Sequence, residues 1–174
     1  MVLRGVSLLS CGLLLAGLAG CSSTRAYFSP ESDLPSVFTA EVQAAQSTVH
    51  VAIYTFTLGT LRDALFDAAA VRGVQVQVCA DAGQTFTLSD QLDALRILRD
   101  DAGAEVATVD GFGGGIMHHK FAVIDSHTVL TGSFNYTRSA SEINDENLVV
   151  IADPALAAHY ESAFGELWSR CEAL

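Results

Sequence analysis

Apolar residues along this chain recur with two different periods, and these periods predict alternating helices and strands. The apolar residues between Val37 and Ala45 recur at the spacing of one helix face, so a helix is expected there. Residues 48–56 are β-branched and aromatic, which is typical of a buried strand. Helical spacing returns over 58–72 and ends at Gly73, a residue that suits the end of a helix.

The rest of the chain continues this alternation. Further strands are expected over 74–80, 105–109, 121–125, 128–131 and 148–152. Further helices are expected from a cap at Ser89 or Asp90 to Asp101, and from Pro154 to Trp168, since proline suits the first helical turn. Strands that alternate with helices predict an α/β fold with a mostly parallel or mixed β-sheet sandwiched between helices.

The first twenty residues have the pattern of an export leader. Arg4 gives a positive start, and the apolar run over 6–18 is too short to span a bilayer. The run ends in Leu18-Ala19-Gly20-Cys21, which resembles the lipobox of bacterial lipoproteins. That resemblance implies cleavage before Cys21 and acylation of its thiol. The alternatives are an ordinary secretory leader and an uncleaved anchor.

These features predict three segments. We expect a lipoprotein signal peptide over 1–20, a lipidated tether over 21–35 and one folded domain over 36–174. Acyl chains on Cys21 would anchor the protein to a membrane. Ser22 resembles the sorting preference of Gram-negative outer-membrane lipoproteins, so the expected location is the bacterial cell envelope, on the periplasmic side of the outer membrane.

The composition is acidic. The 174 residues carry 9 Lys and Arg against 20 Asp and Glu, a formal net charge of −11, and removal of 1–20 would remove Arg4 but no acidic residue. This balance opposes tight non-specific binding to nucleic acid and adsorption to anionic lipid, because both need clustered cations. A local positive region can still exist on an acidic protein.

Two cysteines lie within the expected domain. An exported chain meets an oxidising compartment, where Cys79 and Cys171 would form one disulfide. The alternative is a buried thiol at Cys79 and a solvent-facing thiol at Cys171, since sequence does not fix disulfide geometry. The chain has no C-x-x-C spacing, so a zinc or redox site is not expected.

The candidate chemistry centres on Lys120, the single lysine of the chain. It lies in the pattern H-x-K-x4-D-x6-G-S-x-N, which starts at His118 and ends at Asn135. A compact ammonium suits a tetrahedral phosphoryl group, and a histidine near it supplies a nucleophile or proton carrier. Residues two apart on a strand share a face, so His118 and Lys120 act together while His119 points away. The pattern predicts metal-free cleavage of a phosphodiester.

The same residues resemble the HKD motif of the phospholipase D superfamily. Thr131–Thr137, Glu146-Asn147 and Tyr54–Thr57 are also similar to its small members with one motif, which include bacterial endonucleases and the mitochondrial cardiolipin hydrolase type. The resemblance covers about residues 36–170. It implies the α-β-α fold of that superfamily for the domain over 36–174, and a reaction that needs neither metal nor cofactor.

The resemblance also implies a role for each motif residue. His118 is similar to the nucleophile that forms a phosphohistidine, and Lys120 to the cation that holds the phosphate oxygens. Ser133 and Asn135 look like the residues that complete the phosphate pocket. Glu146 resembles the carboxylate that orients the histidine ring. These residues, with Asp125, make up the predicted catalytic set.

Two further expectations follow from the motif. Asp125 belongs to it by name, but it lies five residues after Lys120 and faces away on a strand, so its role is more structural than catalytic. The chemistry needs two histidines and the chain has one motif. Relatives with one motif form homodimers, and an isologous interface would bring both copies of His118 into one composite site.

Phospholipid is the expected substrate, and DNA or RNA is the alternative. The lipid anchor and the acidic surface favour phospholipid, whereas chain size and resemblance favour DNA or RNA. A phospholipase predicts an apolar rim around the site, with candidates Phe86, Phe112, Ile116 and Met117, although core or loop packing is the better interpretation of the last two. A nuclease predicts arginines near the site, with candidates Arg25, Arg62 and Arg138. A non-catalytic scaffold lipoprotein is the remaining alternative.

Overall fold

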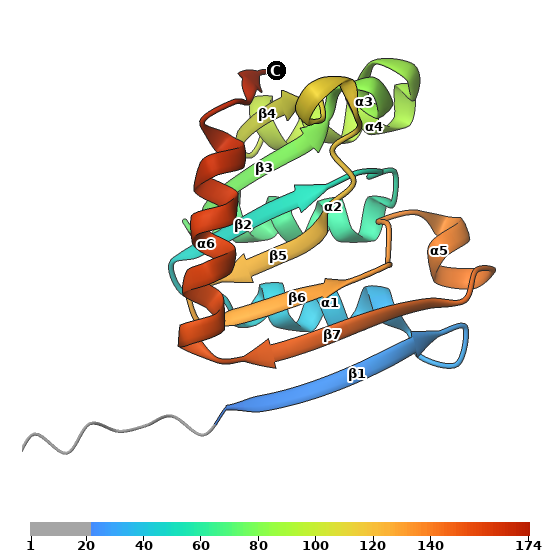
Figure 1. The fold of residues 1–174 in the computed structure, drawn as a ribbon, viewed down its shortest axis with the longest axis vertical. Helices are drawn as coiled ribbons and strands as arrows, with labels where there is room; N and C mark the ends of the chain where they lie inside the picture. The colour runs from blue at the N-terminus through green and yellow to red at the C-terminus, as the bar shows by residue number, and fades with distance from the viewer. Residues whose placement is uncertain (1–21) are drawn as a thin grey trace, which may run out of the picture.

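The computed structural model describes residues 22–174, so Cys21 and the expected leader over 1–20 lie outside the described residues. The described chain forms an eight-stranded sheet in the order β1-β7-β6-β5-β2-β3-β4-β8 (Figure 1). The strands are β1 (Ser23–Ser29), β2 (Thr48–Ile53), β3 (Gln75–Asp81), β4 (Glu105–Val109), β5 (Lys120–Ile124), β6 (Thr128–Gly132), β7 (Glu146–Ala152) and β8 (Glu172–Ala173).

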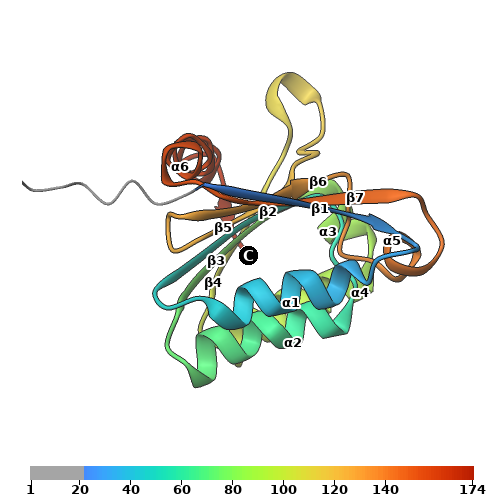
Figure 2. The same ribbon diagram turned by 90° about the horizontal axis from the view of Figure 1, so that it is seen from below.

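Helices cover both faces of this sheet. They are α1 (Leu34–Ala44), α2 (Gly59–Phe66) with a π-helical end η1 (Asp67–Val71), α3 (Ala82–Thr87), α4 (Ser89–Asp100), a 3-10 turn η2 (Phe112–Gly114), α5 (Arg138–Glu142) and α6 (Pro154–Trp168). Figure 2 shows α1 and α2 on one side of the sheet and α6 on the other. The expected sandwich of helices around a sheet is confirmed.

Each face of the sheet packs its own apolar cluster. The larger cluster includes Phe38 of α1, Leu61 of α2 and Leu95 of α4, all fully buried. The smaller cluster places Phe164 of α6 against Phe121 of β5 and its strand neighbours. Burying such a side chain stabilises the fold by roughly 1.5–3 kcal/mol, so α1, α2 and α4 hold one face of the sheet and α6 holds the other.

The sheet is mixed, and its parallel part is small. Only β2–β3 and β3–β4 pair in parallel among the described strands, and the other pairs are antiparallel. Helical crossovers join the parallel strands. The short turn at Asp125–His127 instead links β5 to β6 and allows only an antiparallel hairpin, because a parallel connection needs a dozen residues or more.

The expected tether over 21–35 is wrong for Ser23–Ser29. This segment is β1, and it pairs antiparallel with β7 along its whole length. Most of its side chains are exposed because the strand lies at the sheet edge, so its composition resembles a linker. Ser29 is the buried exception, and its hydroxyl donates to the carbonyls of Ala140 and Asn144 at 3.1 and 2.9 Å.

A disulfide joins Cys79 on β3 to Cys171 after α6. Both residues belong to the smaller cluster under α6, with Cys79 fully buried. The sequence left open whether the two cysteines are bonded or free, and in the structure they are bonded. In residues 22–174 no helix has the length and apolar character needed to cross a membrane.

Candidate active site

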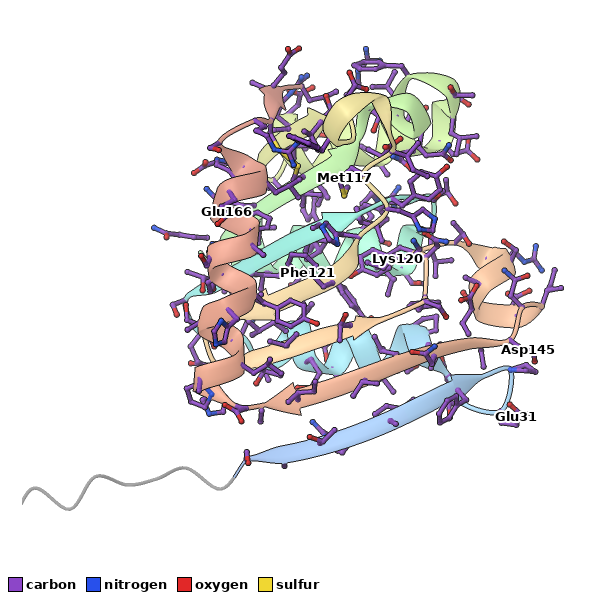
Figure 3. All side chains as sticks on the ribbon, viewed as in Figure 1. Glu31, Met117, Lys120, Phe121, Asp145 and Glu166 are labelled. Atoms are coloured by element: carbon purple, nitrogen blue, oxygen red, sulfur yellow. A yellow bond between two sulfur atoms is a disulfide. The ribbon has the colours of Figure 1, made fainter. Side chains whose placement is uncertain are left out.

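The motif residues gather where β5 begins beside the end of β2. Lys120 is the first residue of β5 and lies at the end of that strand nearest α5 (Figure 3). The backbone N–H of Tyr54, just after β2, donates to the carbonyl of His119 at 3.0 Å. The antiparallel pairing of the two strands therefore continues past their ends and fixes the residues around His118.

His118 and Lys120 flank one aromatic ring. The His118 ring lies edge-on to Tyr54, with 4.5 Å between the centroids, and Lys120 Nζ lies 5.2 Å from the same Tyr54 centroid. Lys120 Nζ also donates to the His118 carbonyl at 2.8 Å. His119 instead packs against Phe121, whose ring contacts Tyr160 of α6. The predicted separation of His118 from His119 is therefore what the structure has.

The local environment shifts two pKa values in this group. Burial lowers the pKa of Lys120, and the nearby carboxylate of Glu146 offsets part of that effect. Burial also lowers the pKa of His119, and the positive charges of Lys120 and Arg170 add to it. Both effects favour the neutral form of the His119 ring, while Lys120 and Glu146 lie close enough to interact electrostatically.

Ser133 and Glu146 are held together across β6 and β7. The Ser133 hydroxyl donates to Glu146 Oε2 at 2.5 Å and accepts from the backbone N–H of Asn147 at 3.1 Å. Asn144 donates to the other Glu146 oxygen at 3.1 Å. A Cβ on Gly132 would lie 2.2 Å from the Asn147 carbonyl, which explains the glycine that precedes the serine in the motif.

Asn135 reaches the site through a bridge to the chain after β2. Tyr136 donates its N–H to the Thr55 carbonyl at 2.9 Å and forms an isolated parallel bridge with Phe56. This pairing brings the segment of Asn135 beside that of Tyr54. The Asn135 Oδ1 atom is buried and has no hydrogen-bond partner among the described residues. The carbonyl oxygen of Asn135 is therefore an acceptor that the fold does not use.

Glu146 makes no hydrogen bond to His118 within the described chain. Its hydrogen bonds go to Ser133 and Asn144, so the expected bond that would orient the His118 ring is not formed inside residues 22–174. The arrangement places His118, Lys120, Ser133, Asn135 and Glu146 at one end of the sheet. Their side chains supply a nucleophile, a cation, a hydroxyl, a carboxylate and an amide.

Asp125 lies at the opposite end of β5 from His118. Its carboxylate accepts from the backbone N–H groups of Gln46, Ser47 and Thr48 at 2.8, 2.7 and 3.0 Å. Burial acts to raise the pKa of Asp125, but these hydrogen bonds outweigh it and lower the pKa. Asp125 thus closes the turn before β2, and the expectation of a structural role agrees with its position.

The residues proposed for an apolar rim separate into two groups. Phe112 is 90% exposed, Phe86 69% and Ile116 59%, whereas Met117 is buried in the smaller cluster. The segment around η2, which holds Phe112, projects from the sheet on the side of α6 (Figure 2). Met117 is therefore a core residue, whereas Ile116 lies exposed in the loop before His118.

The arginines proposed for a nucleic-acid surface are each paired with an acid. Arg25 pairs with Glu41, Arg62 with Asp63 and Arg138 with Glu142, at 2.8, 2.6 and 2.8 Å. Each pair leaves little net positive charge at its position. The described chain thus presents Lys120 as the cation that the motif places at the site.

A pocket of about 400 Å³ opens beside the motif. Residues of β5 and β6 form one wall, and His159, Tyr160 and Ala163 of α6 form the other. Sequence reasoning missed the residues of α6, because helical periodicity marks which residues are buried but not which strand ends they face. No group of three or more metal-ligating side chains occurs in the part of the chain that the structure describes.

Comparison with known proteins identifies relatives of this fold and motif. The family described as "Cardiolipin synthase, PLD-like domain" matches residues 38–168. The mitochondrial cardiolipin hydrolase of Chlamydomonas reinhardtii is 32% identical over 149 residues, which cover 86% of this chain and 64% of that protein. The phospholipase D of Rickettsia bellii is 31% identical over 139 residues, which cover 80% and 66%. The chain thus spans just under two thirds of these curated relatives.

Two solved structures share the whole architecture. Nuc from Salmonella typhimurium, a phospholipase D family member, has a TM-score of 0.82 and 28% identity, and the match covers 88% of this chain and 98% of Nuc. NucT from Helicobacter pylori has a TM-score of 0.81 and 23% identity, covering 88% of this chain and 99% of NucT. The second likeness establishes similarity of fold.

Proposed function

The chain belongs to the phospholipase D-like family, and from this membership we propose that it is a metal-independent phosphodiesterase that hydrolyses phospholipid. The observation that carries the proposal is the placement of His118 and Lys120 against the same Tyr54 ring. A nucleophile and a compact cation thereby lie close together at the start of β5. These are the groups that a tetrahedral phosphoryl centre needs.

In the proposed first step, a ring nitrogen of His118 attacks phosphorus. The bond from phosphorus to the leaving alcohol oxygen breaks, and a second histidine gives that oxygen its proton. Lys120, Ser133 and Asn135 bind the non-bridging oxygens. In the second step the second histidine takes a proton from water, the water oxygen attacks phosphorus, and the phosphorus–nitrogen bond breaks. The products are a phosphomonoester and free His118.

We propose that a second copy of this chain supplies the second histidine. His118 is the one histidine of the chain with a lysine two residues on, and His50 is bonded to Glu161 at 2.7 Å, so one copy of the chain carries a single motif. A homodimer would bring both His118 rings to one composite site, where Glu146 of either copy can orient the ring of the other. Mixing wild-type with His118→Ala subunits tests this: activity should fall as the square of the wild-type fraction. A linear fall would show that each subunit works alone.

Phospholipid is favoured over nucleic acid by two surface features. Phe112 and Ile116, in the segment that leads into His118, are exposed, as expected for contact with a lipid surface. Arg25, Arg62 and Arg138 are paired with acids and offer little to a phosphate backbone. The names of the relatives from Chlamydomonas reinhardtii and Rickettsia bellii agree with a lipid substrate. Cleavage of DNA or RNA is the competing activity.

One experiment separates these activities. The full chain, purified in detergent, is incubated in EDTA with mixed micelles of fluorescent cardiolipin and phosphatidylcholine, and in parallel with plasmid DNA. We expect release of phosphatidate from lipid, no nicking of the plasmid and no activity of His118→Ala. Plasmid cleavage alone would make the protein a nuclease. Inactivity of a folded dimer toward both substrates would favour the scaffold alternative.

We also propose that Cys21 carries the lipid that holds the protein in the bacterial cell envelope, on the periplasmic side of the outer membrane. Strand β1 begins at Ser23, two residues later, so a lipid on Cys21 would keep the sheet edge close to the bilayer. Feeding cells an alkyne-labelled fatty acid tests this. We expect label on the wild-type chain and none on Cys21→Ser; label on both variants would contradict the anchor.

A further inference from the structure

We propose that a buried hydrogen-bond network of Asp81, Thr85 and Gln91 positions His118 for reaction, an inference that rests on the phosphodiesterase function proposed above. The three side chains are at most 2% exposed. They come from the end of β3, from α3 and from α4. All three precede the motif in the chain, and the reaction steps above do not use them.

Asp81 holds the backbone that enters His118. Its Oδ1 accepts from the N–H of Gln84 at 2.8 Å, which caps α3, and its Oδ2 accepts from the N–H of Met117 at 2.9 Å. Met117 immediately precedes His118, and its side chain is buried. The main chain is thus fixed one residue before the proposed nucleophile.

The chemistry of this site requires a carboxylate. Both partners of Asp81 are N–H donors, and an ionised carboxylate accepts on both oxygens, whereas an amide offers one acceptor and one donor. Capping α3 alone would need one acceptor. No cation pairs with Asp81 within residues 22–174, so its burial is costly unless both backbone bonds are made.

Thr85 and Gln91 extend the network to Tyr54. The Thr85 hydroxyl donates to the Asp81 carbonyl at 2.7 Å and accepts from Gln91 Nε2 at 2.9 Å. Gln91 Oε1 accepts from the Phe56 N–H at 2.7 Å, and Nε2 also reaches the Tyr54 carbonyl at 3.4 Å. The side chain of Gln91 therefore fixes the segment that follows β2.

The two branches of the network meet at His118. One branch holds the main chain at Met117, and the other holds Tyr54, whose ring packs 4.5 Å from the His118 ring. A network with all members satisfied rigidifies its surroundings, and a displacement of about 1 Å at a reacting group can cost 10²-fold in rate. The network thus sets both the path and the packing of the proposed nucleophile.

The test uses Asp81→Asn and a pair of substitutions at Thr85, in the full chain purified in detergent and assayed on the lipid micelles. For Asp81→Asn we expect kcat to fall at least about tenfold with KM within about twofold of wild type. Thr85→Val should lower kcat about threefold or more, and Thr85→Ser, which keeps the hydroxyl, should retain the wild-type value.

Two substitutions serve as matched controls. Asp153→Asn alters a carboxylate that also accepts from two backbone N–H groups, those of Ala155 and Leu156 at 2.9 and 3.1 Å. Thr48→Val removes a buried hydroxyl that has no hydrogen-bond partner in the described chain. Both lie away from the proposed site, so both should keep the wild-type kcat.

A second readout does not depend on activity. In full chain labelled with ¹³C-histidine, the His118 resonance is identified as the one that His118→Ala lacks. We expect Asp81→Asn to shift and broaden it and Asp153→Asn to leave it unchanged. If Asp81→Asn lowers thermal stability but leaves kcat and this resonance unchanged, the network is only structural and the inference is overturned. If the wild type cleaves no diester, the proposed function fails, and the resonance still decides whether Asp81 positions His118.

Discussion

The two ends of β5 carry parts of one sequence motif but have opposite physical characters. At the start of the strand, His118 and Lys120 retain donors and acceptors around Tyr54 that the fold leaves available. At its end, the Asp125 carboxylate accepts hydrogen bonds from three backbone N–H groups. A motif residue with its hydrogen bonds already satisfied by the backbone supports the fold, and one with unused capacity is available for chemistry.

The sharpest way to test this contrast is to remove a histidine from each end of β5. His118→Ala should lose activity by about 10⁴-fold or more, since it removes the proposed nucleophile, with little change in the free energy of unfolding. His127→Ala is the matched control, because His127 is exposed and bonds Thr128 beyond the other end. Lipid hydrolysis by both variants measures the difference; comparable losses would break the contrast.

The next effect in size concerns the single lysine. Lys120→Arg keeps the charge but replaces a compact ammonium by a planar fork, so we expect kcat/KM to fall about 10²-fold. For Lys120→Met, which removes the charge, kcat/KM should fall further. Steady-state hydrolysis of the lipid micelles gives both values. A Lys120→Arg enzyme within threefold of wild type would show that the site needs charge alone.

At the other end, Asp125→Asn should act on stability. Its carboxylate holds three N–H groups, so the free energy of unfolding should fall by about 2 kcal/mol at pH 7. Because the folded pKa of Asp125 lies below the model-peptide value of 3.8, this stability is present above pH 3.8 and is lost as pH falls through the folded pKa. Urea unfolding of both proteins at pH 7 and pH 3 should show the difference shrinking at low pH.

The kinetics of the same variant complete that test. The folded fraction of Asp125→Asn should keep kcat within about threefold of wild type, since Asp125 lies away from His118. A large loss of kcat with an unchanged free energy of unfolding would instead make Asp125 part of the chemistry.

The smallest expected effect concerns access from a lipid surface. Phe112→Ser should lower hydrolysis of phospholipid vesicles about three- to tenfold, because it removes an aromatic ring that is 90% exposed in the segment that leads into His118. Cleavage of a soluble diester such as bis(p-nitrophenyl) phosphate should not change. Val71→Ser is the control, since Val71 is 71% exposed but belongs to η1 on the other side of the sheet. Equal losses on the soluble diester would argue against contact with lipid.

Much of the fold was predictable from periodicity, and the exceptions have physical reasons. The strands at the centre of the sheet are buried on both sides and therefore read as continuous apolar runs, as around Val51 and Val78. Strand β1 was not predicted, because an edge strand exposes most of its side chains and needs few apolar residues. The short helices α3 and α5 were not predicted, because they are set by caps at Asp81 and Thr137 and not by a hydrophobic stripe.

The motif residues of the site were also predictable, because fixed spacing on a strand determines which side chains share a face. The residues that hold these side chains in place were not predictable. The bond between Asp81 and the N–H of Met117 joins positions 36 residues apart, and no local pattern marks it. The same holds for Tyr160 of α6, which reaches the site only after the helix docks on the sheet. The bond from Glu146 to His118 was expected from resemblance, whereas inside this chain Glu146 binds Ser133.

The proposed mechanism requires His118, just before β5, to form a covalent bond to phosphorus. The most direct test is to mix enzyme with cardiolipin micelles, quench in base within milliseconds, digest the protein and search each histidine peptide by mass spectrometry for a phosphatidyl adduct. We predict the adduct on His118, with none on His119, His127 or His159. An adduct on another histidine, or its absence during rapid turnover, would contradict this mechanism.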